Sequence, residues 1–190
     1  MRIGILGGTF NPIHIGHLIL AEEAYRLLKL DKLIFIPCYL PPHKTSQGLI
    51  SAKHRFHMVK EAIKENKNFL VSDIEIKEKG ISYTFKTLQK IRKIFPPSTE
   101  IFLIVGSDAI DELPRWKNFD LILKLSKIVI ATRANFPIEK RPKWAKIIRI
   151  PYIEISSSQI RKRIKRGLPI RYFVPSQVEK YIEKNKLYYE

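Results

Sequence analysis

The sequence has little cysteine and no long hydrophobic run, and each shortage excludes a class of protein. Cys38 is the one cysteine, which leaves neither an internal disulfide nor a Cys-x-x-Cys metal site. The apolar runs at 101–105 and 128–131 have the length of strands and are too short to cross a membrane. The start of the chain does not match a signal peptide, because two glycines soon interrupt the apolar residues that follow Arg2. We therefore expect a cytoplasmic protein without a membrane partner.

Acidic residues are also scarce relative to basic ones. The chain of 190 residues has 35 Lys and Arg against 18 Asp and Glu, a net charge of +17. Such an excess is typical of proteins with an anionic partner, and equally of a surface that is simply rich in lysine. The basic residues are spread along the chain, so we attribute most of them to the surface and expect a subset to contact phosphate. A hydrophobic content of 45% indicates a globular chain with a real core.

Candidate strands alternate with candidate helices along the whole chain. Short apolar runs predict strands at 2–6, 32–36, 69–76, 100–105, 127–132 and 146–150. Apolar spacing predicts helices at 15–28, 51–65, 82–94, 157–166 and 176–184, with Ser51, Ser82, Ser157 or Ser158, and Ser176 as their caps.

This alternation predicts the fold class. Strands separated by helices need crossover connections, which favour a mainly parallel sheet covered by helices on both faces. We therefore predict one α/β domain over residues 1–190 with a Rossmann-like, doubly wound sheet. Ligands of such sheets bind at the carboxyl ends of the strands, so the residues after positions 6, 36, 105 and 130 are the candidates for a site.

The segment 7–17 combines glycines and histidines directly after the first predicted strand. Gly7 and Gly8 allow a sharp turn and a close approach of the backbone to a ligand. The helix that follows offers free amide groups and the positive end of its dipole, which suits phosphate. His14 and His17 share one face of a helical turn, and Gly16 between them leaves room for a ribose or a base. Imidazoles beside a phosphate can donate hydrogen bonds to oxygens that gain charge in a transition state.

A structural role or a zinc site fits this segment less well. A lone histidine is more often a structural residue, and a zinc site would need a third ligand besides His14 and His17. The Gly-x-Gly-x-x-Gly fingerprint and the Gly-Lys-Ser/Thr of P-loops are both absent. The position of the segment after the first strand therefore favours a phosphate site of a different kind.

A second candidate phosphate site lies at 155–161. Ser156, Ser157 and Ser158 supply hydroxyl groups and free amides at the start of a predicted helix. Arg161 follows Ser158 by three residues, so its guanidinium can face the same side and grip phosphate oxygens as a fork. An ordinary N-cap followed by a basic solvated helix would give the same pattern. Together with the first segment, we interpret it as the second wall of a triphosphate site.

Three weaker signals lie between these segments. Lys44 in a Pro-Pro-His-Lys loop can reach an anionic substrate, Gly106 and Asp108 can approach a ribose, and Trp116 can stack on a flat ring. Taken alone, each residue fits a plainer structural role. Lys44 would lie in a surface loop, Asp108 would cap a helix and Trp116 would belong to the core.

Together these segments resemble the bacterial nicotinate mononucleotide adenylyltransferases of the nucleotidyltransferase superfamily. The similarity rests on 7–17, Pro-Pro-His-Lys at 41–44, Ser-Tyr-Thr at 82–84, Gly-Ser-Asp at 106–108, Trp116 and 155–161, and it extends to 168–175. The first and last of these motifs identify only the superfamily, whereas the Pro-Pro-His-Lys loop and the region of Trp116 narrow it to this family.

The resemblance implies transfer of AMP from ATP to nicotinate mononucleotide, which gives deamido-NAD and pyrophosphate in NAD biosynthesis. It implies in-line attack of the acceptor phosphate on the α-phosphorus, with Mg²⁺ carried by ATP rather than held by a protein metal site. The residues that it assigns to ATP are Gly7, Gly8, Thr9, Phe10, His14, Gly16, His17, Gly106, Asp108, Arg133, Ser156, Ser157, Ser158 and Arg161. The residues that it assigns to the acceptor are Lys44, Thr84 and Trp116. His14, His17 and Arg161 are the expected catalytic residues, and the helical part at 157–190 is expected to complete the ATP site.

The chain departs from the family pattern at three positions. Asn11 stands where many relatives have Asp, Ser158 where Thr is common, and Lys117 where an aromatic residue often follows the tryptophan. Asn11 and Ser158 keep the size and polarity of the usual residues. Lys117 changes the prediction of the acceptor only slightly, because the backbone at this position, rather than the side chain, is expected to contact the acceptor.

Several other functions share part of this pattern. Phosphopantetheine adenylyltransferase shares the first and last motifs, but it is usually shorter and lacks the Pro-Pro-His-Lys loop. A preference for the amide mononucleotide stays open, as does a homo-oligomer. Class I aminoacyl-tRNA synthetases share His-Ile-Gly-His, but this chain is too short for one and has no Lys-Met-Ser-Lys-Ser. A nucleic-acid-binding protein would need a concentrated basic face, and the only such stretch that we find is 161–166.

Overall fold

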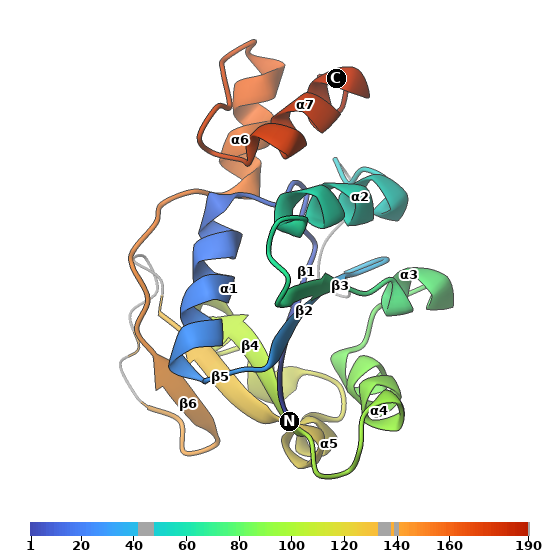
Figure 1. The fold of residues 1–190 in the computed structure, drawn as a ribbon, viewed down its shortest axis with the longest axis vertical. Helices are drawn as coiled ribbons and strands as arrows, with labels where there is room; N and C mark the ends of the chain where they lie inside the picture. The colour runs from blue at the N-terminus through green and yellow to red at the C-terminus, as the bar shows by residue number, and fades with distance from the viewer. Residues whose placement is uncertain (42–47, 133–137, 139–140, 190) are drawn as a thin grey trace.

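Figure 1 shows the chain in a computed structural model, which describes residues 1–41, 48–132, 138 and 141–189. These residues form a 6-stranded sheet in the order β3-β2-β1-β4-β5-β6, and all neighbouring strands are parallel. The strands are β1 (Arg2–Gly8), β2 (Lys32–Pro37), β3 (Phe69–Val71), β4 (Glu100–Gly106), β5 (Lys127–Ala131) and β6 (Ala145–Ile148). The order of the strands reverses between β1 and β4, which is the point at which such sheets bind ligands.

Helices lie on both sides of this sheet. They are α1 (Ile15–Leu27), α2 (Ala52–Ile63), α3 (Ile74–Glu78), α4 (Thr84–Ile94), α5 (Phe119–Leu125), α6 (Ser157–Lys165) and α7 (Ser176–Lys184). Side chains of α1, α2, α6 and α7 belong to one buried cluster, and those of α4 and α5 belong to another. The predicted Rossmann-like, doubly wound α/β fold is therefore confirmed. In Figure 1, β1 runs from the N-terminus towards the end of the molecule where α6 and α7 lie. No helix in the described ranges is both long and apolar enough to cross a bilayer.

Alternate residues of each central strand enter the two clusters. In β4, Ile101, Leu103 and Val105 pack with α4 and α5, whereas Phe102 and Ile104 pack with α1 and α2. Successive side chains of a strand point to opposite faces, so a strand that is covered on both faces must be apolar throughout. This explains why the sequence over 101–105 has no polar position.

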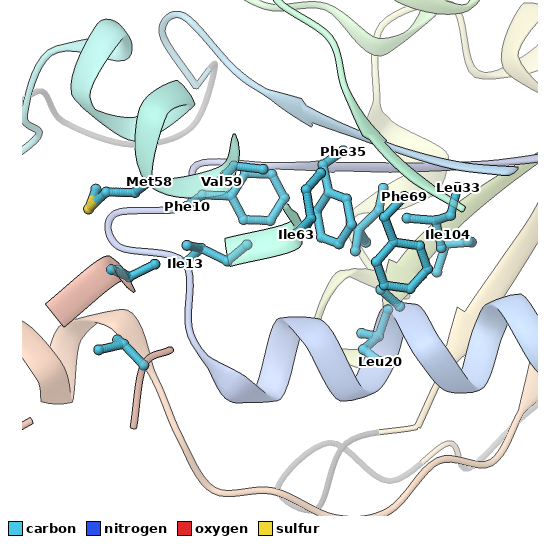
Figure 2. Packing of buried hydrophobic residues seen from close by; sticks show 14 of the residues in the cluster. Phe10, Ile13, Leu20, Leu33, Phe35, Met58, Val59, Ile63, Phe69 and Ile104 are labelled. Atoms are coloured by element: carbon cyan, nitrogen blue, oxygen red, sulfur yellow. The ribbon is translucent and has the colours of Figure 1, made fainter. Parts of the chain in front are cut away.

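The cluster around α1 and α2 anchors the turn that follows β1 (Figure 2). Phe10 of this turn is 2% exposed, and its ring centroid lies 5.9 Å from that of Phe35 in β2. Ile13, further along the turn, is fully buried in the same cluster as Met58 and Val59 of α2. Burial of side chains this large stabilises the fold by about 1.5–3 kcal/mol each. The core therefore fixes the conformation of the turn.

The segment after β3 differs from the predicted structure. The strand expected over 69–76 ends at Val71, and the last backbone hydrogen bond to β2 runs from the amide of Ser72 to the carbonyl of Phe35 at 2.9 Å. The hydroxyl of Ser72 then accepts a hydrogen bond from the amide of Ile74 at 3.4 Å, and α3 begins there. This side chain offers the backbone a local partner that competes with a continued strand, so the expectation of a long strand is wrong.

Three predicted helix caps are also wrong by one residue. Tyr83 is the N-cap of α4, because the hydroxyl of Ser82 accepts a hydrogen bond from the amide of Tyr39 instead. Ser156 caps α6 in place of the two serines that follow it, and its hydroxyl accepts a hydrogen bond from the backbone of that helix. Pro175 takes the cap position of α7, and its fixed φ is compatible with the residue that precedes a helix.

Gly4 in β1 has no room for a side chain. A Cβ atom there would lie 2.6 Å from Cδ1 of Leu30 and 3.0 Å from Cδ1 of Ile104. We expect Gly4→Ala to lower the free energy of unfolding by about 1–3 kcal/mol, the usual cost of overpacking a core. Gly7→Ala in the same strand is the control, because nothing lies within 4 Å of its Cβ position. Urea unfolding measures both variants, and equal stabilities would contradict the close packing of β1 against Leu30.

Candidate active site

The turn after β1 is held in a compact conformation. A Cβ atom on Gly8 would lie 2.9 Å from the ring of Phe10, so glycine lets that ring fold beneath the strand end. Phe10 has a φ of 48°, in the left-handed region that a bulky residue rarely adopts. Its buried ring offsets the cost of this conformation, which is on the order of 1–3 kcal/mol. The backbone of the turn is therefore fixed before any ligand arrives.

His14 and His17 lie against each other at the start of α1. Their ring centroids are 3.7 Å apart with 36° between the planes. The backbone amide of His14 donates a hydrogen bond to Nδ1 of His17 at 3.2 Å. A neutral imidazole that accepts at Nδ1 carries its proton on Nε2, so Nε2 of His17 is the atom that can donate to a ligand. The ring of Phe10 packs edge-on against His17 at 5.1 Å and restricts its orientation.

Gly16 has a packing role, whereas its predicted role beside a ribose or base stays a prediction. A Cβ atom there would lie 3.1 Å from Nδ1 of His14 and 3.7 Å from Cγ2 of Ile153. The missing side chain thus makes room first for the imidazole of His14, which is 2% exposed. A glycine between the histidines is therefore needed for their close contact.

Asn11 joins the turn to two segments that are distant in the sequence. Its side-chain nitrogen donates to the carbonyl of Gly48 at 2.8 Å, and its side-chain oxygen accepts from the hydroxyl of Tyr188 at 2.8 Å. Its backbone carbonyl accepts from Nη1 of Arg161, also at 2.8 Å. Burial raises the pKa of Tyr188 far above its ordinary value, so this hydroxyl stays protonated and can donate. An ionised Asp at this position could not donate to the carbonyl of Gly48. This hydrogen bond gives a local reason for Asn11, which stands where many relatives have Asp.

The start of α6 docks on the same turn. The hydroxyl of Ser157 donates to the carbonyl of Pro12 at 2.8 Å, and Nη2 of Arg161 donates to the hydroxyl of Ser158 at 3.3 Å. Ser156 is the N-cap of this helix. The free amides at the start of a helix and a guanidinium group both favour a bound anion. The two predicted phosphate segments are thus brought together in space.

These groups line a cavity of about 590 Å³, which we call the polar cavity. Every described residue that is predicted to bind ATP lies on its wall: Gly7, Gly8, Thr9, Phe10, His14, Gly16, His17, Gly106, Asp108, Ser156, Ser157, Ser158 and Arg161. Arg133 lies outside the described residues. The ring of Phe10 is packed in the core, so only its backbone can face a ligand. The geometry therefore gathers the predicted residues at one place, while their individual roles stay predictions.

A second cavity of about 470 Å³, which we call the apolar cavity, opens on the other side of the strand ends. Thr84 and Trp116, predicted to hold the acceptor, line it, and Lys44 lies outside the described residues. Tyr83 also lines it, with Nζ of Lys117 4.8 Å from its ring centroid. The two cavities share one wall, formed by Gly7, Gly8, Thr9, Pro41, Ile104, Val105 and Trp116.

Sequence reasoning missed several groups of the apolar cavity. The hydroxyl of Thr87 donates to Oε1 of Glu75 at 2.6 Å, and burial raises the pKa of this carboxyl above its ordinary value. Burial also raises the pKa of the Cys38 thiol, which keeps it protonated and unreactive at neutral pH. Cys38 directly follows β2, so the rule that sites lie after strand ends could have found it. Glu75 and Thr87 carry no such signal, because both lie inside helices.

Comparisons with known proteins identify the family of this chain. Residues 5–163 match the model of the cytidylyltransferase-like family. A probable nicotinate-nucleotide adenylyltransferase of Shouchella clausii is 42% identical over 189 residues, covering 98% of this chain and 96% of the relative. A second protein with this description, from Thermus thermophilus, is 40% identical over 188 residues, covering 99% of this chain and 100% of the relative. A third, from Methylacidiphilum infernorum, is also 40% identical and covers 98% of this chain and 92% of the relative.

Solved structures share the fold at lower identity. Nicotinic acid mononucleotide adenylyltransferase of Plasmodium falciparum, complexed with NaAD, superposes with a TM-score of 0.83 at 23% identity and covers 98% of this chain and 97% of that one. At that level the likeness concerns the fold alone, whereas the relatives above are near 40% identical over almost the whole length. The chain therefore belongs to the cytidylyltransferase-like family and, within it, to the nicotinate-nucleotide adenylyltransferases.

Proposed function

We propose that this chain transfers AMP from ATP to nicotinate mononucleotide, giving nicotinate adenine dinucleotide and pyrophosphate for NAD biosynthesis in the cytoplasm. The observation that carries the proposal is the wall shared by the polar and apolar cavities. A donor phosphate in one cavity and an acceptor ring in the other would meet at this wall, as direct transfer requires. The names and full-length identities of the relatives support the same pair of substrates.

The polar cavity suits the triphosphate of ATP. Arg161 and the amides at the start of α6 would hold the β- and γ-phosphates, because both carry positive charge towards the cavity. Nε2 of His17 would donate to an oxygen of the α-phosphate as that oxygen gains charge in the transition state. Asp108, just after β4, would accept hydrogen bonds from the ribose.

The apolar cavity suits a pyridine ring that carries a carboxylate. Trp116 and Tyr83 supply aromatic surfaces on which a flat ring can stack. Thr84 is the first residue of α4, so its hydroxyl and the free amides beside it would meet the carboxylate. The positive end of the helix dipole stabilises a negative carboxylate more than a neutral amide. The cavity therefore favours the acid over the amide mononucleotide.

The reaction needs no covalent bond to the protein. An oxygen of the acceptor phosphate forms the new bond to the α-phosphorus of ATP. The bond from the α-phosphorus to the oxygen that bridges it to the β-phosphate breaks, and pyrophosphate leaves with that oxygen and both electrons of the bond. The chain's contribution is to align the two substrates and to stabilise the charge on the phosphates.

We infer that ATP brings Mg²⁺ to this site. The described residues offer no group of three or more His, Cys, Asp or Glu that could hold a metal ion. Within the same residues, Asp108 is the one carboxylate on the wall of the polar cavity. This donor set fits an ion that is bound mainly by substrate phosphates and water, as Mg²⁺ usually is. The ion would neutralise phosphate charge, while His17 and Arg161 orient the same phosphates.

Pyrophosphate release tests the proposal directly. Purified protein with Mg-ATP is given nicotinate mononucleotide, its amide or phosphopantetheine as acceptor. We expect the highest kcat/KM with the acid, because the start of α4 favours a carboxylate. A preference for phosphopantetheine would overturn the assignment of the apolar cavity. Release with none of the three would contradict the proposed function as a whole.

His17→Ala should lower kcat by roughly 10²-fold or more, the usual effect of removing one donor to a charged transition state. The KM for ATP should change much less, because the lost hydrogen bond acts mainly in the transition state. Steady-state pyrophosphate release measures both constants.

His57→Ala is the matched control for this change. His57 lies in α2 and stacks on the ring of Tyr181 at 6.1 Å, away from the polar cavity. We expect its kcat to stay close to that of the wild type. If the two variants have similar kcat values, His17 does not stabilise the transition state.

A further inference from the structure

Arg55 of α2 is the largest fully buried side chain that carries a charge. It is 0% exposed, although arginine is almost never fully buried unless it is paired with a carboxylate. The described residues contain no carboxylate that forms an ion pair with it. Burial lowers the pKa of its guanidinium, but arginine keeps its proton because its ordinary pKa is so high. A buried charge without an ion pair is costly, so its position calls for a physical reason.

The guanidinium is satisfied by backbone carbonyls from three segments. Nη1 donates to the carbonyl of Thr9 at 2.8 Å, and Nη2 donates to the carbonyl of Tyr39 at 2.9 Å. Nε donates to the carbonyl of Ile50 at 3.2 Å. Thr9 belongs to the turn after β1, Tyr39 follows β2, and Ile50 precedes α2. One rigid planar group thus fixes the spacing of three segments that are not adjacent in the sequence.

Two of these segments form part of the wall between the cavities. Thr9 lines both the polar and the apolar cavity. Pro41, two residues after Tyr39, also lines both, and Cys38, one residue before it, lines the apolar cavity. The carbonyls of Thr9 and Tyr39, which accept hydrogen bonds from Arg55, therefore belong to segments along which the donor and acceptor would meet. A shift of one segment relative to the other would move the two substrates apart.

We propose that Arg55 is a positioning residue, which holds the turn after β1 and the segment after β2 in register so that the bound acceptor lies in line with the α-phosphorus of ATP. This inference rests on the proposed AMP transfer. Arg55 touches no substrate, since it is fully buried behind the wall. Its effect should therefore appear when both substrates are bound, more than in the binding of ATP alone. Misplacement of reacting groups by about 1 Å can lower a rate by 10²-fold.

Arg55→Lys separates this role from a merely structural one. Lysine keeps the positive charge, but a single ammonium group cannot reach three carbonyls arranged around a planar fork. We expect kcat with saturating ATP and nicotinate mononucleotide to fall by about 10- to 100-fold. The Kd for α,β-methylene-ATP, measured without acceptor, should change by less than about threefold, because the polar cavity keeps its own contacts.

Ile128→Ala is the matched control. Ile128 is 1% exposed near the start of β5 and lines neither cavity, so its loss destabilises the fold without touching the shared wall. Both variants are assayed at the same distance below their thermal midpoints. A loss of kcat in Arg55→Lys that is no larger than in Ile128→Ala would overturn the inference. So would a Kd for the ATP analogue that changes by the same factor as kcat. If the wild type itself gives no turnover, it is the proposed function that fails.

A measurement on the wild-type protein covers the case in which Arg55→Lys does not fold. The Nε–Hε signal of Arg55 in a nitrogen-15 NMR spectrum reports on the carbonyls that the guanidinium contacts. We expect the signal to shift when α,β-methylene-ATP is added alone, and again when nicotinate mononucleotide is added alone. A signal that responds to only one of these ligands, or to neither, would show that Arg55 does not connect the two cavities.

Discussion

The hydrogen bonds around Asn11 bring the two ends of the chain together at one place. Its carbonyl accepts from Arg161, its side-chain oxygen accepts from Tyr188, and its side-chain nitrogen donates to Gly48. Each bond contributes only about 0.5–1.5 kcal/mol to stability. The bond from Arg161 connects α6 to the turn, whereas the bonds with Tyr188 and Gly48 connect the turn to the residues after α7 and before α2. Together with the hydrogen bond from Ser157 to the carbonyl of Pro12, the bond from Arg161 holds the start of α6 beside the turn.

The sheet supplies the rigidity on which this junction rests. β1 and β4 are buried on both faces and pair along most of their lengths, so the residues at their carboxyl ends cannot shift independently. The ring of Phe10 extends this rigidity into the turn, since it packs beside Phe35 while the backbone above it borders the polar cavity. Asn11 then connects the turn to the C-terminal helices, and Arg55 connects it to the segment after β2. In the proposed function, both substrates would be positioned from this single turn.

The fold class could be predicted from the sequence, and the described residues that are predicted to bind ATP line one cavity. The unbroken apolar run at 101–105 indicates a strand covered on both faces, and the two glycines that end β1 lie at the switch point of the sheet. Local signals were less reliable at helix starts, where neighbouring serines compete for the cap. Ser82 shows why, because its hydroxyl is used by Tyr39, a residue that no local pattern connects to it.

Contacts between distant segments could not be predicted from the sequence. In the sequence, Arg55 looks the same as any other basic residue of an amphipathic helix. In the fold it is completely buried, and its guanidinium donates to carbonyls of three segments. Glu75 lies in a segment that resembles a strand, and only the packing of α3 beside α4 brings it to Thr87. Such partners are set by tertiary packing, because a polar residue in a helix carries no local signal for the distant group that it contacts. Asn11 was noticed only as a departure from the family, and its role as a junction appears once Tyr188 and Arg161 are seen beside it.

The central claim is that the turn after β1 and the start of α6 hold the triphosphate between them. A crystal structure with Mg²⁺ and α,β-methylene-ATP tests it most directly. The account predicts an α-phosphate oxygen within hydrogen-bond distance of Nε2 of His17, with the remaining phosphates on Arg161 and the amides of α6. Phosphates bound in the apolar cavity, or held without contact to either His17 or Arg161, would contradict it.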